Sequence, residues 1–151
     1  MVSTVYFTYG MHWCANLVCG SAGAASAVLL RAGEVVEGLE VARTRRSGVP
    51  DRDLARGPAR LAMALALGRD QNGMDTCATD SVFVVRAGEP DRSSRSAVAR
   101  VRTGPRVGVS GPGGDAVAYP WRFWLEGEAT VSAYRAGAVR PPKPAGRPPE
   151  Q

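Results

Sequence analysis

The chain has 151 residues, 44% of them hydrophobic, which is enough for one domain with a packed core. No apolar run reaches the roughly 18 residues that a membrane span needs, and one histidine with three scattered cysteines excludes the usual zinc sites. The net charge of +5 and the pI of about 9.6 come almost entirely from arginine, because Lys143 is the only lysine. This balance favours a nucleic-acid partner, although a coding bias towards arginine would produce the same composition.

The cysteines Cys14, Cys19 and Cys77 are odd in number and follow no secretory leader, so we expect reduced thiols in a cytoplasmic protein. We expect each to be buried as a small hydrophobic side chain. The sequence contains neither a Gly-rich phosphate loop nor a cluster of metal ligands. We therefore expect no cofactor and no metal.

An aromatic segment near the start of the chain predicts a β-hairpin. Residues 5–7 and 12–19 have the composition of strands, and Gly10 marks the tip between them. A turn at residues 20–23 and an apolar run at residues 27–31 add a third, buried strand. Three strands joined by short links form an antiparallel meander.

The aromatic side chains of this hairpin allow two interpretations. In a half-buried strand, Val5, Phe7 and Trp13 belong to the core, and we favour that for these three. Tyr9 lies at the expected tip, where side chains are exposed. Together with Tyr6 it could stack on bases or wedge into a duplex.

Two helices are predicted in the middle of the chain. Residues 37–46 have acidic side chains early and arginines late, which complements the helix macrodipole. Residues 58–67 have proline near the start and Gly68 just beyond the end. The residues of the second helix that share one face by spacing are Leu61, Ala64, Leu65 and Gly68.

The remainder of the chain predicts short strands and a tail. A polar loop covers residues 69–79. Four strands are expected, at residues 81–86, 98–102, 106–110 and 121–125. From residue 136 to 151 the chain is rich in Pro and Arg and is expected to be disordered. We therefore predict a single α+β domain over residues 1–135, with an antiparallel sheet and flanking helices.

Residues 6–16 (YFTYGMHWCAN) resemble the signature of the alkyladenine (3-methyladenine) DNA glycosylases. Shorter blocks follow in the family's order, at residues 28–32, 37–39, 57–61, 64–65, 106–109 and 121–123. The resemblance implies a monofunctional base-excision repair enzyme that flips an alkylated or deaminated purine out of double-stranded DNA. Water then hydrolyses the N-glycosidic bond. Such an enzyme needs no cofactor, and we expect a monomer.

The resemblance assigns four residues to DNA binding. Tyr9 matches the wedge that enters the minor groove and fills the gap left by the flipped nucleotide. Met11 and His12 match positions that lie near the DNA at the hairpin tip. Arg69 matches a basic contact to a phosphate. The predicted hairpin thus inserts into DNA.

The resemblance assigns three further residues to the base pocket. Tyr6 matches a tyrosine that stacks on the extruded base. Asn16 matches an asparagine that disfavours undamaged guanine by a clash with its exocyclic 2-amino group. Arg31 matches an arginine near the pocket floor.

Family members carry a long segment ahead of this hairpin, and that segment supplies the glutamate that activates water. Residues 1–3 cannot replace it, so we expect a chain truncated at its N-terminus, with the general base upstream of Met1. One alternative is a catalytically inactive DNA-binding remnant of the family. Another is a β-rich domain whose aromatic side chains are all core and which does not bind DNA.

Overall fold

The computed structural model describes residues 1–8, 10–86 and 101–137, and the account below is confined to them. The α+β class with antiparallel strands is confirmed. These residues form two compact units, one containing residues 1–86 and 127–132 and the other residues 101–126 and 133–137. The domain boundary expected near residue 135, and the tail beyond it, stay predictions.

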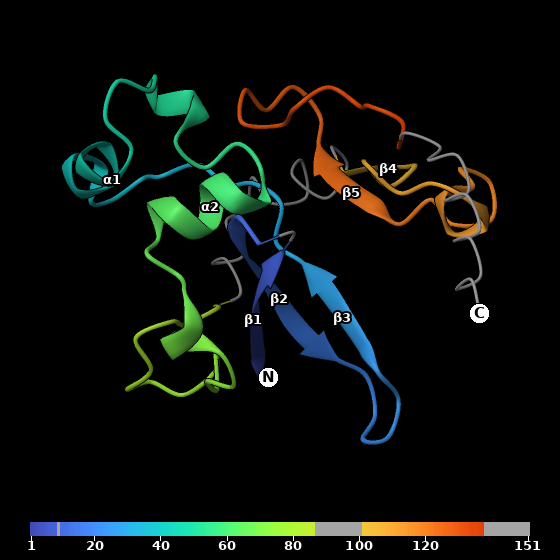
Figure 1. The fold of residues 1–151 in the computed structure, drawn as a ribbon, viewed down its shortest axis with the longest axis horizontal. Helices are drawn as coiled ribbons and strands as arrows, with labels where there is room; N and C mark the ends of the chain where they lie inside the picture. Colours follow the sequence, from blue (N-terminus) through green and yellow to red (C-terminus); the bar gives the residue numbers. More distant parts are fainter. Residues whose placement is uncertain (9, 87–100, 138–151) are drawn as a thin grey trace, which may run out of the picture. The chain divides into compact units, whose positions relative to one another are not determined.

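The first unit contains a three-stranded antiparallel sheet in the order β1 (Ser3–Thr8), β2 (His12–Cys19), β3 (Ser26–Leu29), as Figure 1 shows. The meander is confirmed, and the second strand has the predicted bounds. The Met11 N–H donates to the Thr8 carbonyl oxygen over 3.1 Å and closes the turn between β1 and β2. The hairpin is therefore a local structure within the first 20 residues.

The outer edge of β1 is closed by a loop from far along the chain. The Ser3 N–H donates to the Met74 carbonyl oxygen over 2.9 Å, and the Gly73 N–H donates to the Ser3 carbonyl oxygen over 2.9 Å. The Val5 N–H donates to the Asn72 Oδ1 atom over 3.0 Å. This loop satisfies backbone groups that an edge strand would otherwise leave unpaired.

Both predicted helices are present but shorter than expected. α1 (Leu39–Arg45) begins two residues late, because Gly38 has a φ of 66° in the left-handed region. α2 (Pro58–Ala64) begins at the predicted proline. Short 3₁₀ turns, η1 (Asp51–Asp53) and η2 (Arg69–Gln71), precede and follow α2. No helix in the described part of the chain is long and apolar enough to cross a membrane.

The end of α2 differs from the prediction. The Leu67 N–H donates to the Ala62 carbonyl oxygen over 2.8 Å, and the Ala66 N–H donates to the Met63 carbonyl oxygen over 3.1 Å. This pattern is a Schellman cap, which places one residue in the left-handed region. Ala66 takes that position with a φ of 53°, whereas the expected cap residue Gly68 has an extended backbone.

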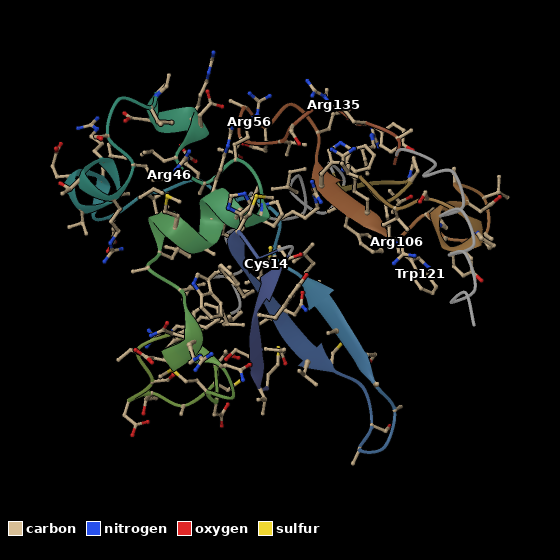
Figure 2. The ribbon with its side chains drawn as sticks, viewed as in Figure 1. Cys14, Arg46, Arg56, Arg106, Trp121 and Arg135 are labelled. Atoms are coloured by element: carbon tan, nitrogen blue, oxygen red, sulfur yellow. The ribbon has the colours of Figure 1, made fainter. Side chains whose placement is uncertain are left out.

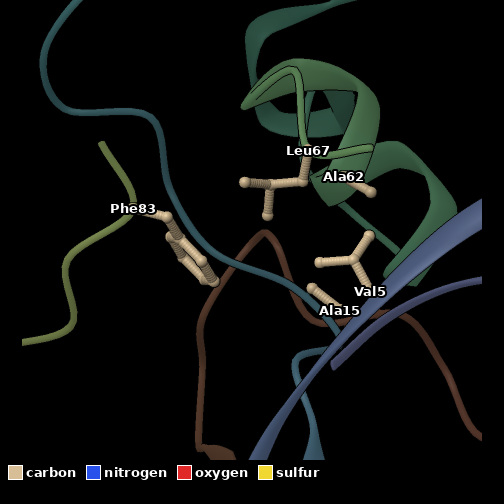
Figure 3. Packing of buried hydrophobic residues seen from close by; sticks show 5 residues of the cluster. All are labelled: Val5, Ala15, Ala62, Leu67 and Phe83. Carbon is tan, nitrogen blue, oxygen red and sulfur yellow. The ribbon is translucent and has the colours of Figure 1, made fainter. Parts of the chain in front are cut away.

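One face of the sheet packs against α2, as Figure 3 shows. The buried residues of this cluster are Val5, Ala15, Ala62, Leu67 and Phe83. A second cluster joins α1, α2 and the two residues that follow η1; its members are Ala42, Leu54, Ala55, Leu61 and Ala64. Two of the predicted helix-face residues, Leu61 and Ala64, are thus core residues, and a third, Leu65, is exposed because the helix has already ended.

Two predictions about the burial of strand residues in the first unit are wrong. The third strand was expected to be buried, but Val28 of β3 is 53% exposed. Phe7 is exposed near the hairpin tip, where its ring contacts Trp13 with centroids 5.0 Å apart. Val5 is buried and Trp13 packs against the core, as predicted.

Residues 81–86 do not form the predicted strand. Phe83 instead inserts into the first core cluster, and the Val85 N–H donates to the Thr76 carbonyl oxygen over 2.7 Å. The apolar composition of this segment therefore reflects burial, not strand pairing.

The second unit contains an antiparallel pair, β4 (Val101–Gly104) and β5 (Arg122–Leu125), and a 3₁₀ turn, η3 (Pro112–Gly114). The strand predicted at residues 121–125 is confirmed, whereas residues 98–100 lie outside the described part. Residues 106–110 are not a strand, because the chain turns at Gly108 with a φ of 72°.

Candidate nucleic-acid interface

Tyr6 and Asn16 lie on the same face of the three-stranded sheet. Tyr6 is opposite Cys14 in the β1–β2 register, and Asn16 follows Cys14 by two residues, so the alternation of side chains puts all three on one face. The opposite face carries Val5 and Ala15, which pack in the core. Tyr6 keeps 39% of its surface exposed.

Arg31 belongs to the same face by register. Beyond the end of β3, the Leu30 N–H donates to the Ala15 carbonyl oxygen over 3.0 Å, which continues the β2–β3 pairing. The next residue, Arg31, therefore comes opposite Cys14. The structure thus brings together the three residues for which the resemblance predicts a base pocket.

Cys14, which is labelled in Figure 2, lies at the centre of this row by register. It is 4% exposed. Burial raises the pKa of the Cys14 thiol, while a hydrogen bond with Tyr6 and the positive charge of Arg31 act in the opposite direction. The net pKa is above its ordinary value, so the thiol is neutral. Cys14 was not predicted as part of the site, although its two-residue spacing from Asn16 is the signal that could have found it.

Asn16 has a neighbour on each adjacent strand. Thr4 is opposite Asn16 on β1, and Leu29 is opposite Asn16 on β3. All three side chains are half-buried. The amide thus lies between a hydroxyl-bearing and a branched apolar side chain.

The prediction that all three cysteines are buried is wrong for Cys19 and Cys77. Cys19 is exposed at the end of β2, and Cys77 is exposed where its N–H donates to the Asp75 carboxylate over 2.9 Å. Both occupy turn-proximal positions that no core element covers. None of the three cysteines forms a disulfide.

The structure describes three of the four residues predicted to bind DNA. Met11 and His12 are exposed together at the hairpin tip. Arg69 is exposed at the start of η2, two residues after the core residue Leu67. Tyr9 lies outside the described residues, so the wedge stays a prediction.

The face formed by Tyr6, Asn16 and Arg31 combines a π surface, an amide and a guanidinium group. Aromatic rings stack on bases, and amides read base edges by hydrogen bonding. Such a face suits the class of protein that binds a nucleobase.

The chain belongs to the methylpurine-DNA glycosylase (MPG) family, whose model matches residues 2–129. It is 54% identical over 138 residues to a Streptomyces avermitilis protein named "Putative 3-methyladenine DNA glycosylase", covering 90% of this chain and 61% of that protein. Proteins of the same name from Leifsonia xyli subsp. xyli and Frankia casuarinae are 51% and 47% identical. These two matches cover 86% and 87% of this chain and 59% and 62% of the relatives.

The family resemblance is thereby confirmed. The chain spans about three-fifths of the length of these relatives. The roles of the seven site residues stay predictions.

Proposed function

We propose that this protein acts in base-excision repair as a DNA glycosylase on 3-methyladenine and on other alkylated or deaminated purines in duplex DNA. The observation that carries this proposal is the family match over residues 2–129, which includes the sheet face with Tyr6, Asn16 and Arg31. The arginine-rich charge of +5 suits a polyanionic substrate. We expect the protein to act in the cytoplasm, on the nucleoid if it is bacterial.

The sheet face would bind the purine after it leaves the duplex. Base–aromatic stacking contributes about 1–3 kcal/mol per base, and the exposed ring of Tyr6 offers such a surface. Asn16 would disfavour undamaged guanine through its 2-amino group. Arg31 would place a positive charge beside the ring, where it can donate hydrogen bonds to acceptors on the base.

Hydrolysis also needs a general base for the attacking water, a contribution of roughly 10²–10⁴ in rate. We assign that role to no residue of this chain. By the family resemblance, the role belongs to a glutamate in the segment that precedes the hairpin in family members.

The test is release of free base from a duplex that carries one 3-methyladenine or hypoxanthine. We expect release by the product of the complete reading frame, detected as an alkali-sensitive abasic site. Asn16→Ala should increase release of undamaged guanine. The matched control is Val28→Ala, an exposed position on β3 that is opposite Leu17 in the register, on the other face of the sheet.

Release no faster than in buffer by the complete product would reject the proposal. If that product binds the damaged duplex tightly and leaves the base in place, the inactive DNA-binding remnant is the correct interpretation. Absence of duplex binding at moderate salt would support neither of these functions.

A further inference from the structure

The two strands of the second unit expose an apolar face. Alternation along β5 puts Phe123 and Leu125 on one face, and Val101 of β4 lies opposite Leu125 in the register. These three side chains are 65%, 38% and 43% exposed, and Trp121, directly before β5, is 59% exposed. We call these four residues the apolar face of β4–β5.

The opposite face of the same pair of strands is the packed one. It carries Arg122, which is buried, and Trp124, which is half-buried. The Arg122 Cζ atom lies 4.6 Å from the centroid of the Trp124 ring. In an antiparallel sheet with one solvated face, that face is normally polar. The β4–β5 pair has the reverse arrangement, which is typical of a face that another segment covers.

An aromatic ridge adjoins the apolar face of β4–β5, and Tyr119 and Trp121 form it. Their rings meet edge to face, with centroids 4.9 Å apart and planes at 75°. The Arg106 Cζ atom lies 5.8 Å from the centroid of the Trp121 ring, and Figure 2 labels both side chains. These contacts hold the indole in one orientation while more than half of its surface stays exposed. Ordered and exposed aromatic side chains are the surface on which polyproline II segments dock.

A carboxylate lies next to the aromatic ridge. The Tyr119 N–H donates to the Asp115 carbonyl oxygen over 3.0 Å, which closes a single turn. The N–H groups of Val117 and Ala118 donate to the Asp115 Oδ1 atom over 2.8 and 2.6 Å, so the carboxylate is fixed at the start of this turn. Asp115 is exposed and makes no ion pair with another described residue. A negative charge in this place favours a cationic ligand.

The chain itself supplies a proline-rich and cationic segment. Residues 140–144 have the sequence Arg-Pro-Pro-Lys-Pro. Pro141 and Pro144 are three residues apart, so they would share one face of a polyproline II helix, which has 3 residues per turn. Arg140 and Lys143 add the positive charge. This segment lies outside the described part of the chain.

The segment is attached close to the aromatic ridge. The Gly108 N–H donates to the Arg135 carbonyl oxygen over 3.3 Å, and Gly108 follows Arg106 by only two residues. Gly137 is the last described residue, and a Cβ atom added to it would come within 2.7 Å of the Val109 carbonyl carbon. The chain is thus packed onto the second unit up to this point. Four extended residues span up to about 14 Å, so the proline-rich segment can reach the side chains around Arg106.

We propose that the proline-rich segment of residues 140–144 docks on the aromatic ridge of Tyr119 and Trp121, with Arg140 paired to Asp115. The prolines pack on the exposed rings, and the removal of this apolar area from water favours the contact. Because the segment is tethered, its effective concentration at the ridge is in the millimolar range. A contact that is weak between separate molecules is therefore populated within one chain. The inference goes beyond the proposed function, since the contact involves neither DNA nor the base pocket.

The test follows the indole N–H signals of the whole 151-residue chain by NMR in the absence of DNA. The chain has three tryptophans, and loss of one signal in Trp121→Phe assigns the signal of Trp121. The double variant Pro141→Ala/Pro144→Ala should shift this signal, because the ring loses its cover. The signal of Trp124 should stay in place, since that side chain lies on the packed face of the same strand.

The matched control comes from the same tail. Pro148→Ala/Pro149→Ala also removes two prolines, but these two lack the three-residue spacing, so all three indole signals should stay in place. A synthetic peptide of residues 138–151 is then added to the double variant. It should return the Trp121 signal to its wild-type position at millimolar concentration, which matches the effective concentration of the tethered segment.

Asp115→Asn tests the charge separately from the apolar contact. The amide keeps an oxygen that can accept the N–H groups of the turn, whereas the negative charge is lost. Introduced into the double variant, this substitution should raise the peptide concentration needed for half of the shift by about two- to fivefold, the range of an exposed ion pair. An unchanged concentration would show that Asp115 does not pair with the segment, which contradicts that part of the inference.

Two other outcomes overturn the inference as a whole. If the Trp121 signal has the same position in the wild type and in the double variant, the segment does not dock on the ridge. If the wild-type signal instead moves with protein concentration, a second copy of the chain covers the ridge. Neither outcome depends on the release of a base from DNA, so the proposed function stands or fails by its own test.

Discussion

Tyr6 lies directly opposite Cys14 across the β1–β2 ladder, with the tyrosine exposed and the thiol buried. Cross-strand neighbours of this kind are within contact distance, so the ring covers the thiol from one side. Cys14 therefore reports on whether Tyr6 is in place. Because Tyr6 is the residue expected to stack on a base, the thiol reports on the candidate site without touching a ligand.

We predict that two of the three thiols react quickly with a disulfide reagent at pH 8 and that Cys14 reacts only after unfolding. Cys19 and Cys77 are exposed, whereas burial keeps the pKa of Cys14 above its ordinary value and only the thiolate is reactive. Tyr6→Ala should make Cys14 reactive in the folded protein. The measurement is the amount of thiol released from the reagent over time, with the labelled cysteine identified by mass spectrometry.

Tyr6→Phe is the control for this prediction, because it keeps the ring and removes the hydroxyl. Protection retained in Tyr6→Phe and lost in Tyr6→Ala assigns the effect to coverage by the ring. Rapid labelling of all three cysteines in the wild-type protein would contradict the buried position of Cys14.

A second prediction concerns the Asn72 side chain, which accepts the Val5 N–H over 3.0 Å. Asn72→Ala leaves that partly buried N–H without its acceptor, at a cost of about 1–3 kcal/mol in the free energy of unfolding. Asn72→Asp keeps an oxygen in the same position and should cost less. Urea unfolding measures both, and equal stability of Asn72→Ala and wild type would show that this bond is dispensable.

A third prediction concerns Ala66, which has a φ of 53° after α2. The left-handed region costs an L-residue with a Cβ about 1–2 kcal/mol, and glycine avoids this cost. The greater freedom of glycine in the unfolded chain offsets about 0.5–1 kcal/mol of the gain. We therefore predict that Ala66→Gly stabilises the fold by up to about 1 kcal/mol.

Ala64→Gly is the matched control, since it lies two residues earlier in the helix and is buried. It should destabilise the protein by about 1 kcal/mol or more. Both free energies of unfolding come from the same urea titration. A loss of stability in Ala66→Gly comparable to that in Ala64→Gly would mean that residue 66 is not in the left-handed conformation.

A fourth prediction concerns pH and the ion pair between Arg43 and Asp51, with donor–acceptor distances of 2.9 and 2.7 Å. Hydrogen bonding from Arg43 chiefly lowers the pKa of Asp51. A carboxyl group with a lower pKa in the folded state binds fewer protons there, so its contribution is present at neutral pH. It is lost as the pH falls below the ordinary value of 3.8 towards the lowered pKa.

The melting temperature of Asp51→Asn should therefore fall less between pH 6 and pH 3 than the melting temperature of the wild type does. The pair is exposed, so the difference should be small and should shrink in high salt. The matched control is Asp80→Asn, because Asp80 makes no ion pair with any described residue. A wild-type and an Asp51→Asn protein with parallel pH profiles would contradict the prediction.

Local patterns in the sequence predicted the elements whose formation is itself local. The aromatic hairpin, the third strand and the start of α2 at Pro58 all follow from residues within a short window. The face containing Tyr6 and Asn16 follows in turn from strand alternation. Cys14 was missed because it was assessed as a core hydrophobe and not by its place in the register.

The failures arose where long-range packing decides the structure. Phe83 and its apolar neighbours have strand composition, yet Phe83 is buried against α2 and Val5 from a loop. Val28 has strand composition too, and the strand forms, but the composition did not show that the Val28 side chain would be exposed. A shallow groove lined by Met11 and His12 from the hairpin and by Met63 from α2 likewise joins distant parts of the sequence, a pairing that no local window contains.

The loop that closes the outer edge of β1 has a consequence for the order of folding. The Ser3 hydroxyl donates to the carbonyl oxygens of Gln71 and Met74, across separations of 68 and 71 residues. A hairpin forms within about 1–10 μs once its two strands exist, but this edge waits until residue 74 has been synthesised. During that interval the strand that carries Tyr6 presents an open edge to other nascent chains. Slow translation between the hairpin and this loop should therefore favour aggregation of the new chain.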